Sequence, residues 1–302
     1  MSTAITATGL GKRYRQRWAL RECTLEIPEG RVAGLVGPNG AGKTTLLHLA
    51  TGLLEPTTGT VSVFGLNPRV DAQALPVIGF VGQEVPLYRS FTVADMLSFG
   101  RHLNPSWDDQ LARSRLDRLD IPLRDRVDQL SGGQRAQLAL ALALAKRPRV
   151  LLLDEPLASL DPLARREFLQ TLMESVAEDG VTVLLSSHLV MDLERVCDYL
   201  IVLARGHTQV VGDIDQLLRM HKILTGPPRN VVGIGGVASV VQETKTERQT
   251  IALVRTEGPI LDPGLTEESV GLEDLVLAYL GQPSATALPQ PRLTPLKVEV
   301  SR

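Results

Sequence analysis

The sequence predicts an α/β protein built on a mostly parallel β-sheet with helices around it. Three short apolar runs carry this prediction, "RVAGLVG" at 31–37, "RVLLLDEP" at 149–156 and "VTVLLSSH" at 181–188. Each is hydrophobic without alternation and ends in glycine or polar residues, which is typical of strands covered on both faces. Helices are expected over 43–51 and 162–177, so ligands should gather at the carboxyl ends of the strands.

The region from about 85 to 147 predicts a helical insertion. It contains the helical stretches "TVADMLSFGRHL" and "SWDDQLARSRLDRLD" and the alanine- and leucine-rich run after Gly133. No segment in it has the composition of a strand. We therefore expect a helical subdomain inside the α/β domain.

The character of the chain changes again near Gly226, where "TGPPRN" interrupts the preceding pattern. "VASVVQETKTERQTIALVRT" predicts two strands joined by a charged turn, and "SVGLEDLVLAYL" predicts a last helix. We expect a small β-containing accessory domain at 226–282. The proline-rich segment 283–302 has no apolar period and predicts a disordered tail.

Composition places the chain among folded globular proteins. Its 302 residues are 43% hydrophobic and 22% charged, and the formal net charge is -2. That charge is too small to recruit nucleic acid, which we do not expect as a partner. Cys23 and Cys197 stand alone, which favours buried thiols in a reducing compartment. No secretory signal is visible, and the apolar runs are shorter than the ~20 residues that cross a bilayer.

A glycine-rich loop lies between the first of these strands and the helix expected after it. "GPNGAGKT" at 37–44 satisfies G-x-x-x-x-G-K-[ST]. Glycines allow successive N–H groups to converge on phosphates, Lys43 can reach the β- and γ-phosphate oxygens, and Thr44 offers a hydroxyl to Mg²⁺. A chance glycine turn would not require the strand before it and the helix after it. The sequence therefore predicts a P-loop NTPase core.

A pair of acids supports this prediction. In "VLLLDEP" an apolar strand ends at Asp154 and Glu155. One carboxylate can hold a metal through water, and the next can polarise an attacking water. Solvated acids at a strand end would explain the pair equally well in isolation, but a phosphate loop upstream favours the metal and base reading.

A second pair of glycines follows in "DQLSGGQRAQLALALALA", where Ser131, Gly132 and Gly133 begin a predicted helix that would attract an anion. With "GPNGAGKTT", "LSGGQ" at 130–134 and "LLLDEP" in this order, the chain resembles the nucleotide-binding subunit of ATP-binding cassette (ABC) transporters. The resemblance covers about 3–220 and includes the five-residue signature without a mismatch. It implies that the nucleotide is ATP and that the activity is ATP hydrolysis.

The resemblance also implies a dimer. In that family two subunits pack head to tail, and each ATP lies between the phosphate loop of one chain and the signature of the other. Ser131 and the N–H groups of Gly132 and Gly133 would then complement the γ-phosphate of the partner's ATP. We expect a homodimer that ATP closes and hydrolysis opens.

Individual roles follow from the same resemblance. Glu155 would orient the attacking water, and Gln83 in "FVGQEVPLY" would touch Mg²⁺ and that water. His188 would reach the γ-phosphate, although a lone histidine is often structural. Metal contacts are expected from Thr44, Gln83 and Asp154. Nucleotide contacts are expected from Tyr14, Gly37, Pro38, Asn39, Gly40, Ala41, Gly42, Lys43, Thr44, Thr45, Ser131, Gly132, Gly133, Gln134 and Asp161.

Two of these residues keep alternative readings, and two further positions depart from the family pattern. Tyr14 would stack on adenine, but Trp18 is nearby and tyrosines are often half-buried packing residues. Asp161 precedes Pro162 and is equally suited to cap a helix. Gln137 departs from the family pattern, which often has a basic residue there, and so does Leu157, where a small polar residue is usual.

The function expected from this resemblance is that of an ATP-hydrolysing subunit on the cytoplasmic side of the cell membrane, attached peripherally. It would power translocation by separate permease subunits, reached near Gln83 and the helical insertion. Stretches such as "PLYRSFTVADML" resemble bacterial exporter subunits, although an importer subunit would share every catalytic residue. A soluble ABC-type ATPase and a nucleotide-gated regulatory module are the alternatives. The transported substrate is not readable from this chain.

Overall fold

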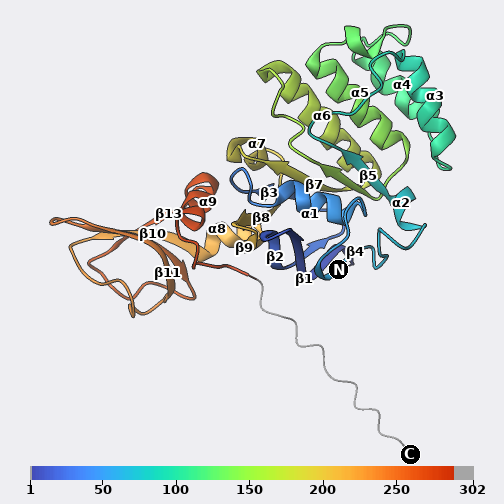
Figure 1. Cartoon of the computed structure of the whole chain (residues 1–302). Helices are drawn as coiled ribbons and strands as arrows, with labels where there is room; N and C mark the ends of the chain where they lie inside the picture. Colours follow the sequence, from blue (N-terminus) through green and yellow to red (C-terminus); the bar gives the residue numbers. More distant parts are fainter. Residues whose placement is uncertain (1, 289–302) are drawn as a thin grey trace, which may run out of the picture.

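A six-stranded sheet forms the centre of the computed structural model, which describes residues 2–288. Its strand order is β5-β6-β7-β3-β8-β9, with β9 alone antiparallel to its neighbour. This confirms the predicted α/β class with a mostly parallel sheet (Figure 1). The strands are β3 (Val32–Val36), β5 (Ile78–Val81), β6 (Val150–Leu153), β7 (Thr182–Ser187), β8 (Tyr199–Ala204) and β9 (His207–Asp213).

Alternation along these buried strands builds two hydrophobic cores, one on each face of the sheet. Val183 and Leu185 face a core shared with α5, α6 and α7, whereas Leu184 faces a core shared with α1. Because side chains alternate across a sheet, continuous hydrophobicity fills both cores at once. The helices on the two faces are α1 (Lys43–Ala50), α5 (Gly132–Ala145), α6 (Pro162–Asp179) and α7 (Val190–Glu194).

A second sheet covers the α1 side and was not anticipated from the sequence. It has the antiparallel order β2-β1-β4. Burial along β2 alternates between core and solvent, as expected of a sheet with one wet face. The strands are β1 (Thr3–Tyr14), β2 (Arg17–Pro28) and β4 (Thr58–Val63), and the short helix α2 (Ala74–Val77) precedes β5.

The expected helical insertion is present and has a core of its own, with Leu97, Leu116 and Leu138 at its centre. Helix α5 joins this core to the main one, because Leu140 and Leu144 on another of its faces pack under the central sheet. The described part of 85–147 contains no strand. The elements are α3 (Val93–Leu103), α4 (Asp109–Arg118), the 3₁₀ turn Val127–Gln129 and α5.

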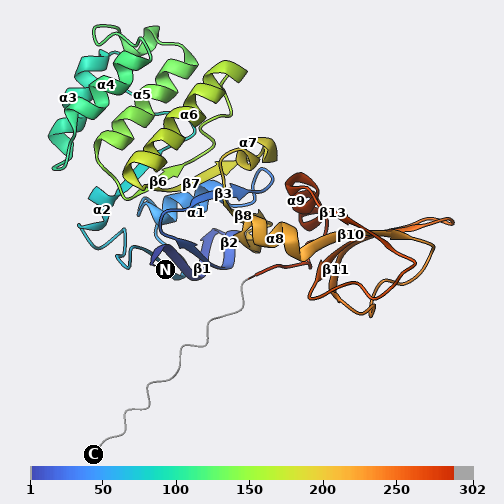
Figure 2. The ribbon, with the colours of Figure 1, turned by 180° about the vertical axis from the view of Figure 1, so that it is seen from behind.

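A four-stranded antiparallel sheet projects from the other end of the molecule, beyond β9 (Figures 1 and 2). Its order is β11-β12-β10-β13, and β11 and β12 form the hairpin expected from the sequence. The elements are α8 (Ile214–Met220), β10 (His221–Gly226), β11 (Val237–Lys245), β12 (Thr250–Thr256), β13 (Thr266–Ser269) and α9 (Leu272–Gly281).

The accessory domain does not separate from the cassette where the sequence suggested. Its sheet begins at His221 rather than at 226, since β10 pairs with β12 and β13. Helix α9 is the expected last helix, but Leu275 and Tyr279 on it belong to the same core as Val202 of the central sheet. The accessory segment is therefore anchored in the main body.

Part of the segment that we expected to be a disordered tail, from 283 onward, is ordered against β9. Ala287 N–H donates to the Gln209 carbonyl at 2.7 Å, and Val211 N–H donates to the Ala287 carbonyl at 3.1 Å. The buried amide of Gln209 donates to the carbonyls of Gln282 and Ala285. Residues 283–288 are thus held along β9. The remainder of that prediction, 289–302, lies outside the described residues.

Candidate nucleotide site

The phosphate loop runs from the end of β3 into α1. Gly40 and Gly42 have φ of 80° and 107°, a conformation that favours glycine. A Cβ on Gly37 would lie 2.2 Å from the Leu203 carbonyl oxygen, so only glycine fits there. Within residues 2–288 no side chain caps the start of α1 at Gly42, which leaves backbone N–H groups available to an anion.

The loop forms one wall of an open pocket of about 540 Å³, called here the phosphate-loop pocket. The structure brings together residues that lie far apart in the sequence and that motifs indicated independently. Their convergence at the carboxyl ends of β3, β6 and β7 is the arrangement expected of a parallel α/β sheet. The pocket is lined by Ala19, Asn39, Gly40, Ala41, Gly42, Lys43, Thr44, Thr45, Gln83, Glu155, Ala158 and His188.

Charged groups are in direct contact at the bottom of this pocket. Lys43 is 5% exposed, and its Nζ donates to the Gly37 carbonyl at 2.7 Å. The same Nζ lies 3.1 Å from Glu155 Oε1, while His188 Nδ1 lies 3.1 Å from Glu155 Oε2. Glu155 is therefore held between a cation of the phosphate loop and the imidazole at the end of β7.

The backbone of Glu155 has a positive φ of 45°, which is costly for a residue with a side chain. Ser186 supports it from the adjacent strand. The Glu155 N–H donates to Ser186 Oγ at 2.8 Å, and Ser186 Oγ donates to Asp154 Oδ1 at 2.9 Å. Ser186 thus fixes both acids. Its signal in the sequence is weak, a hydroxyl two residues before His188.

Thr44 and Gln83 line the pocket, and Asp154 lies beneath it with 1% of its surface exposed. The described residues contain no group of three or more His, Cys, Asp or Glu side chains able to hold a metal. A hydroxyl, an amide and one carboxylate nevertheless fit Mg²⁺, which prefers oxygen and keeps water and phosphate ligands. The donor set is compatible with magnesium that arrives with a nucleotide.

The residues of the signature, 130–134, do not line the phosphate-loop pocket. Ser131 caps α5, since its Oγ accepts from Gln134 N–H at 3.1 Å while the Gln134 side chain accepts from Ser131 N–H. Asp161 caps α6 in a similar way, which confirms its helix-cap reading. A Cβ on Gly133 would lie 2.8 Å from Ala164 Cβ, so glycine permits the two helices to meet.

Ser131, Gly133, Gln134 and Asp161 line a second pocket of about 180 Å³, called here the signature pocket. None of the residues that line it also lines the phosphate-loop pocket. Within the described chain, the two groups of predicted nucleotide contacts are therefore separate.

Tyr14 does not line either pocket. It lies at the tip of the β1–β2 hairpin and is 47% exposed, with Lys12 Nζ 5.5 Å from the centre of its ring. Trp18, on the same hairpin, is 37% exposed and carries Arg13 over its ring. The adenine contact predicted for Tyr14 stays a prediction.

A parallel α/β sheet with a phosphate loop opposite a strand-end acid defines a nucleotide-binding protein of the P-loop class. Comparison with known proteins narrows this class. The family described as "ABC transporter" matches residues 20–158. The chain belongs to the ABC transporter family, as a nucleotide-binding subunit, and it binds and hydrolyses ATP.

Two curated relatives illustrate the match. The ABC transporter ATP-binding protein YtrB of Bacillus subtilis is 31% identical over 208 residues, covering 69% of this chain and 71% of that protein. The sulfate/thiosulfate import ATP-binding protein CysA of Brucella melitensis is 36% identical over 226 residues. That match covers 70% of this chain and 62% of CysA, so the chain spans less than two thirds of that relative.

Solved structures agree. The dimeric bacterial ABC transporter cassette MJ0796 superposes with a TM-score of 0.63 at 26% identity, covering 70% of this chain and 98% of the cassette. CbiO1 of Clostridium perfringens, described as part of the ABC transporter complex cbiONQ, gives a TM-score of 0.63 at 27% identity, covering 72% and 92%. Within residues 2–288 no helix is both long and apolar enough to span a bilayer.

Proposed function

We propose that this chain couples ATP hydrolysis to export of a substrate through separate membrane permease subunits, as a peripheral subunit on the cytoplasmic side of the membrane. The observation that carries the ATP-dependent part of this proposal, a dimer with shared sites, is the division of predicted nucleotide contacts between two separate pockets on one chain. The phosphate-loop pocket lacks the signature residues, and the signature pocket lacks the phosphate loop. A second copy, packed head to tail, would complete both.

The dimer is supported by helix geometry as well as by the relative MJ0796, whose structure is described as dimeric. Ser131 and the first N–H groups of α5 lie at an open helix start, where partial positive charge favours an anion. The γ-phosphate of ATP held by the partner's phosphate loop would meet that charge. Loss of this phosphate on hydrolysis would remove the contact and allow the subunits to separate.

Within one pocket the side chains have distinct roles. Lys43 now pairs with Glu155, and incoming phosphates would compete for its ammonium group. Glu155 would then be free to accept a proton from the attacking water, while His188 holds the carboxylate in place and faces the γ-phosphate. Gln83, which lines the same pocket, would position the same water.

Mg²⁺ would be held by Thr44, Gln83 and, through water, Asp154. When bound, the ion neutralises charge on the phosphate oxygens. Ser186 orients Asp154 toward this role by donating to one carboxylate oxygen.

The permease contact is proposed for the helical insertion close to Gln83. Tyr88, Phe91 and Phe99 form an aromatic cluster there, with ring centroids 5.0 to 6.4 Å apart. Tyr88 is 53% exposed and Phe99 is 38% exposed, so the cluster presents an apolar surface to solvent. The relative CbiO1 is described as part of a larger transporter complex, which supports a membrane partner.

The proposed direction of transport is export. The relative CysA is named an import protein, whereas the name of YtrB gives no direction. Export rests on the resemblance of stretches such as "PLYRSFTVADML" to exporter subunits. Reconstitution with the permease and measurement of substrate movement would separate the two directions, and uptake toward the ATPase side would refute export.

Replacing Glu155 with glutamine tests the mechanism. The Glu155→Gln variant should lose hydrolysis by at least about 100-fold because the general base is removed, and it should still bind ATP. Light scattering should show that it accumulates as an ATP-bound dimer. Lys43→Ala is the matched control, because it should weaken ATP binding and remain monomeric. Monomers that hydrolyse ATP at full rate throughout turnover would refute the shared site.

A further inference from the structure

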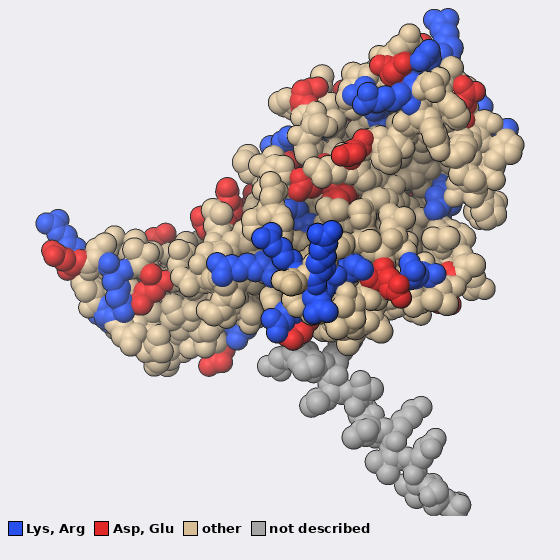
Figure 3. Space-filling view, in the orientation of Figure 1, with Lys and Arg blue, Asp and Glu red and all other residues tan. Residues whose placement is uncertain are grey.

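The surface around the phosphate-loop pocket carries a concentration of arginines that the reaction as described does not use. The first 21 residues include five basic residues and no acidic one, although the whole chain has a net charge of -2. Figure 3 shows a group of Lys and Arg side chains over the region of β1 and β2. We define the arginine rim as Arg13, Arg15, Arg17 and Arg205, all of them exposed.

Backbone contacts place this rim beside the pocket. Arg21 N–H donates to the Gly206 carbonyl, and Gly206 N–H donates to the carbonyl of Ala41 in the phosphate loop, at 2.8 and 3.1 Å. A Cβ on Gly42 would lie 2.5 Å from the carbonyl oxygen of Ala19, which itself lines the pocket. The β1–β2 hairpin and the β8–β9 turn thus interlock with the loop.

Two of these arginines occupy unusual positions. Tyr14 pairs with Arg17 at the end of the β1–β2 hairpin, and Arg15 lies in the turn between them with a φ of 53°. Arg205 begins the β8–β9 turn with a φ of 51°. Glycine and asparagine adopt this conformation at lower cost. Arginine is therefore present at both turns although glycine or asparagine would form them at lower cost.

The rim is not neutralised by the protein. Among the described residues, none of its four guanidinium groups forms an ion pair with a carboxylate. Arg13 instead lies 5.4 Å from the centre of the Trp18 ring, which leaves its charge uncompensated. Unpaired like charges on neighbouring turns repel one another, and a passing polyanion would relieve that repulsion.

We infer that the arginine rim captures the nucleotide: its field attracts the polyphosphate chain from solution and guides it into the phosphate-loop pocket. This inference rests on the proposed placement of ATP in that pocket. The rim raises the rate of association and favours ATP over ADP, because the triphosphate carries more negative charge. None of the four arginines lines the phosphate-loop pocket, so the rate of dissociation should depend little on the rim.

The test uses the full chain and a methylanthraniloyl-labelled ATP in stopped-flow fluorescence. The rim variant combines Arg13→Gln, Arg15→Asn, Arg17→Gln and Arg205→Asn, where asparagine suits the positive φ of both turns and guards against misfolding. The matched control combines Arg101→Gln, Arg124→Gln, Arg219→Gln and Arg248→Gln, four exposed arginines of other elements. Both variants lose the same number of positive charges.

We expect the rim variant to associate about tenfold more slowly at low ionic strength, with an unchanged dissociation rate. The difference should shrink for labelled ADP and vanish near 1 M salt, where the Debye length is about 3 Å. The control variant should match the wild type. Equal association rates and salt slopes for the wild type and the rim variant would overturn the inference, as would equal slowing by the control. Failure of the wild type to bind labelled ATP would instead refute the proposed function.

Discussion

Glu155 combines a strained backbone with the chemistry proposed for it. A glutamate with a positive φ of 45° is retained only when neighbouring groups over-determine its position. Ser186 is one of those groups, because its hydroxyl accepts from the Glu155 N–H and donates to Asp154. The side chain of one serine therefore sets the relative placement of the proposed base and the proposed metal ligand.

Replacing Ser186 with alanine should separate positioning from binding. In the Ser186→Ala variant, Glu155 N–H and Asp154 lose a buried partner, so we expect a fall of about tenfold in kcat with little change in the affinity for ATP. Steady-state kinetics and equilibrium ATP binding measure the two effects. Ser186→Thr keeps the hydroxyl and should restore most of kcat.

Ser187→Ala is the control for this experiment, because the Ser187 hydroxyl forms local hydrogen bonds with the backbone of Leu189. It should leave kcat nearly unchanged. An equal loss in both serine variants, or a loss of ATP affinity that accounts for the fall in turnover, would contradict a positioning role for Ser186.

The sequence was most informative where the residues that act together are neighbours in one motif. The phosphate loop and the acid pair were predictable because adjacent residues meet the same ligand. Ser186 was not, because its role depends on β6 and β7 lying in register, with Leu153 opposite Leu185. The exposed position of Tyr14 was equally hidden, since it is set by a hairpin whose strands alternate between core and solvent.

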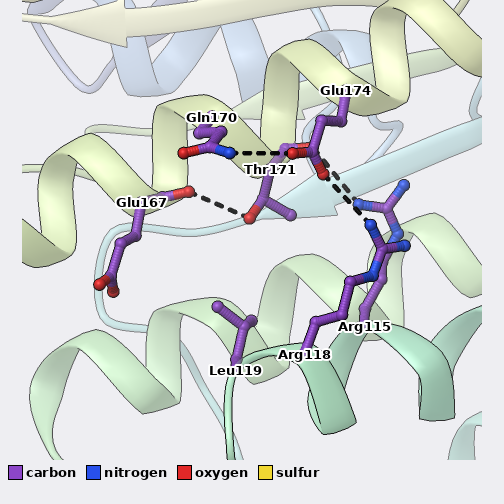
Figure 4. A pocket seen from close by; sticks show the side chains of 7 residues that line it. All are labelled: Arg115, Arg118, Leu119, Glu167, Gln170, Thr171 and Glu174. Carbon is purple, nitrogen blue, oxygen red and sulfur yellow. Dashed lines mark hydrogen bonds and ion pairs between the residues drawn. The ribbon is translucent and has the colours of Figure 1, made fainter.

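At the scale of elements, α4 and α6 meet through an incompletely satisfied cation (Figure 4). Arg115 on α4 is 2% exposed, and its Nη1 reaches the Thr171 carbonyl at 3.4 Å. Within the part of the chain that the structure describes, its Nε and Nη2 have no hydrogen-bond partner, and Nη2 lies 3.9 Å from Glu178 Oε2. Burial lowers the pKa of Arg115. A charge held this way contributes little to stability.

We therefore predict that Arg115→Met is neutral or stabilising, by up to about 2 kcal/mol, because an apolar chain of similar length removes a buried charge with few partners. Urea unfolding measures the free energy. Arg118→Gln is the control, since Arg118 is exposed and pairs with Glu174 across the same joint, and its loss should cost about 0.5 kcal/mol or less. Marked destabilisation by Arg115→Met would show that the guanidinium holds the two helices together.

Several elements of the cassette were predictable from composition, and one sheet that was not predicted has a physical reason for being missed. Continuous apolar runs indicated β3, β6 and β7, and helix formers indicated α1, α5 and α6. The sheet of β1, β2 and β4 was not predicted because its strands are only half buried and therefore lack a continuous apolar run. The helix α9 was located correctly, but its packing partners lie in a distant part of the chain and leave no local trace.

At the scale of the whole molecule, a buried histidine at the start of the accessory sheet is hydrogen-bonded both to α8 and to α9. His221 is fully buried, with Nδ1 bonded to the Leu217 carbonyl at 2.7 Å and Nε2 to the Tyr279 hydroxyl at 2.8 Å. Burial lowers the pKa of His221, assisted by Arg255 across the sheet. Burial also raises the pKa of Tyr279 to about 12. Both groups are thus kept neutral in the native state.

This pair predicts a pH dependence of stability. As the pH falls below the ordinary histidine value of about 6.5, the unfolded chain binds a proton that native His221 resists, so the free energy of unfolding decreases. Urea unfolding at pH 7.5 and 5.5 should show a smaller difference for His221→Gln than for the wild type. The exposed His207→Gln serves as control and should keep the wild-type difference. An unchanged difference in His221→Gln would contradict the prediction.

The anchoring of α9 has a practical consequence for anyone who shortens or recombines this protein. A chain truncated near residue 220, where the family resemblance ends, would lose Leu275 and Tyr279. Apolar side chains of β8 and α7 would then be exposed to solvent. Such a fragment should aggregate. The projecting sheet is therefore no detachable module: any chimaera that exchanges it must take the closing helix along with it.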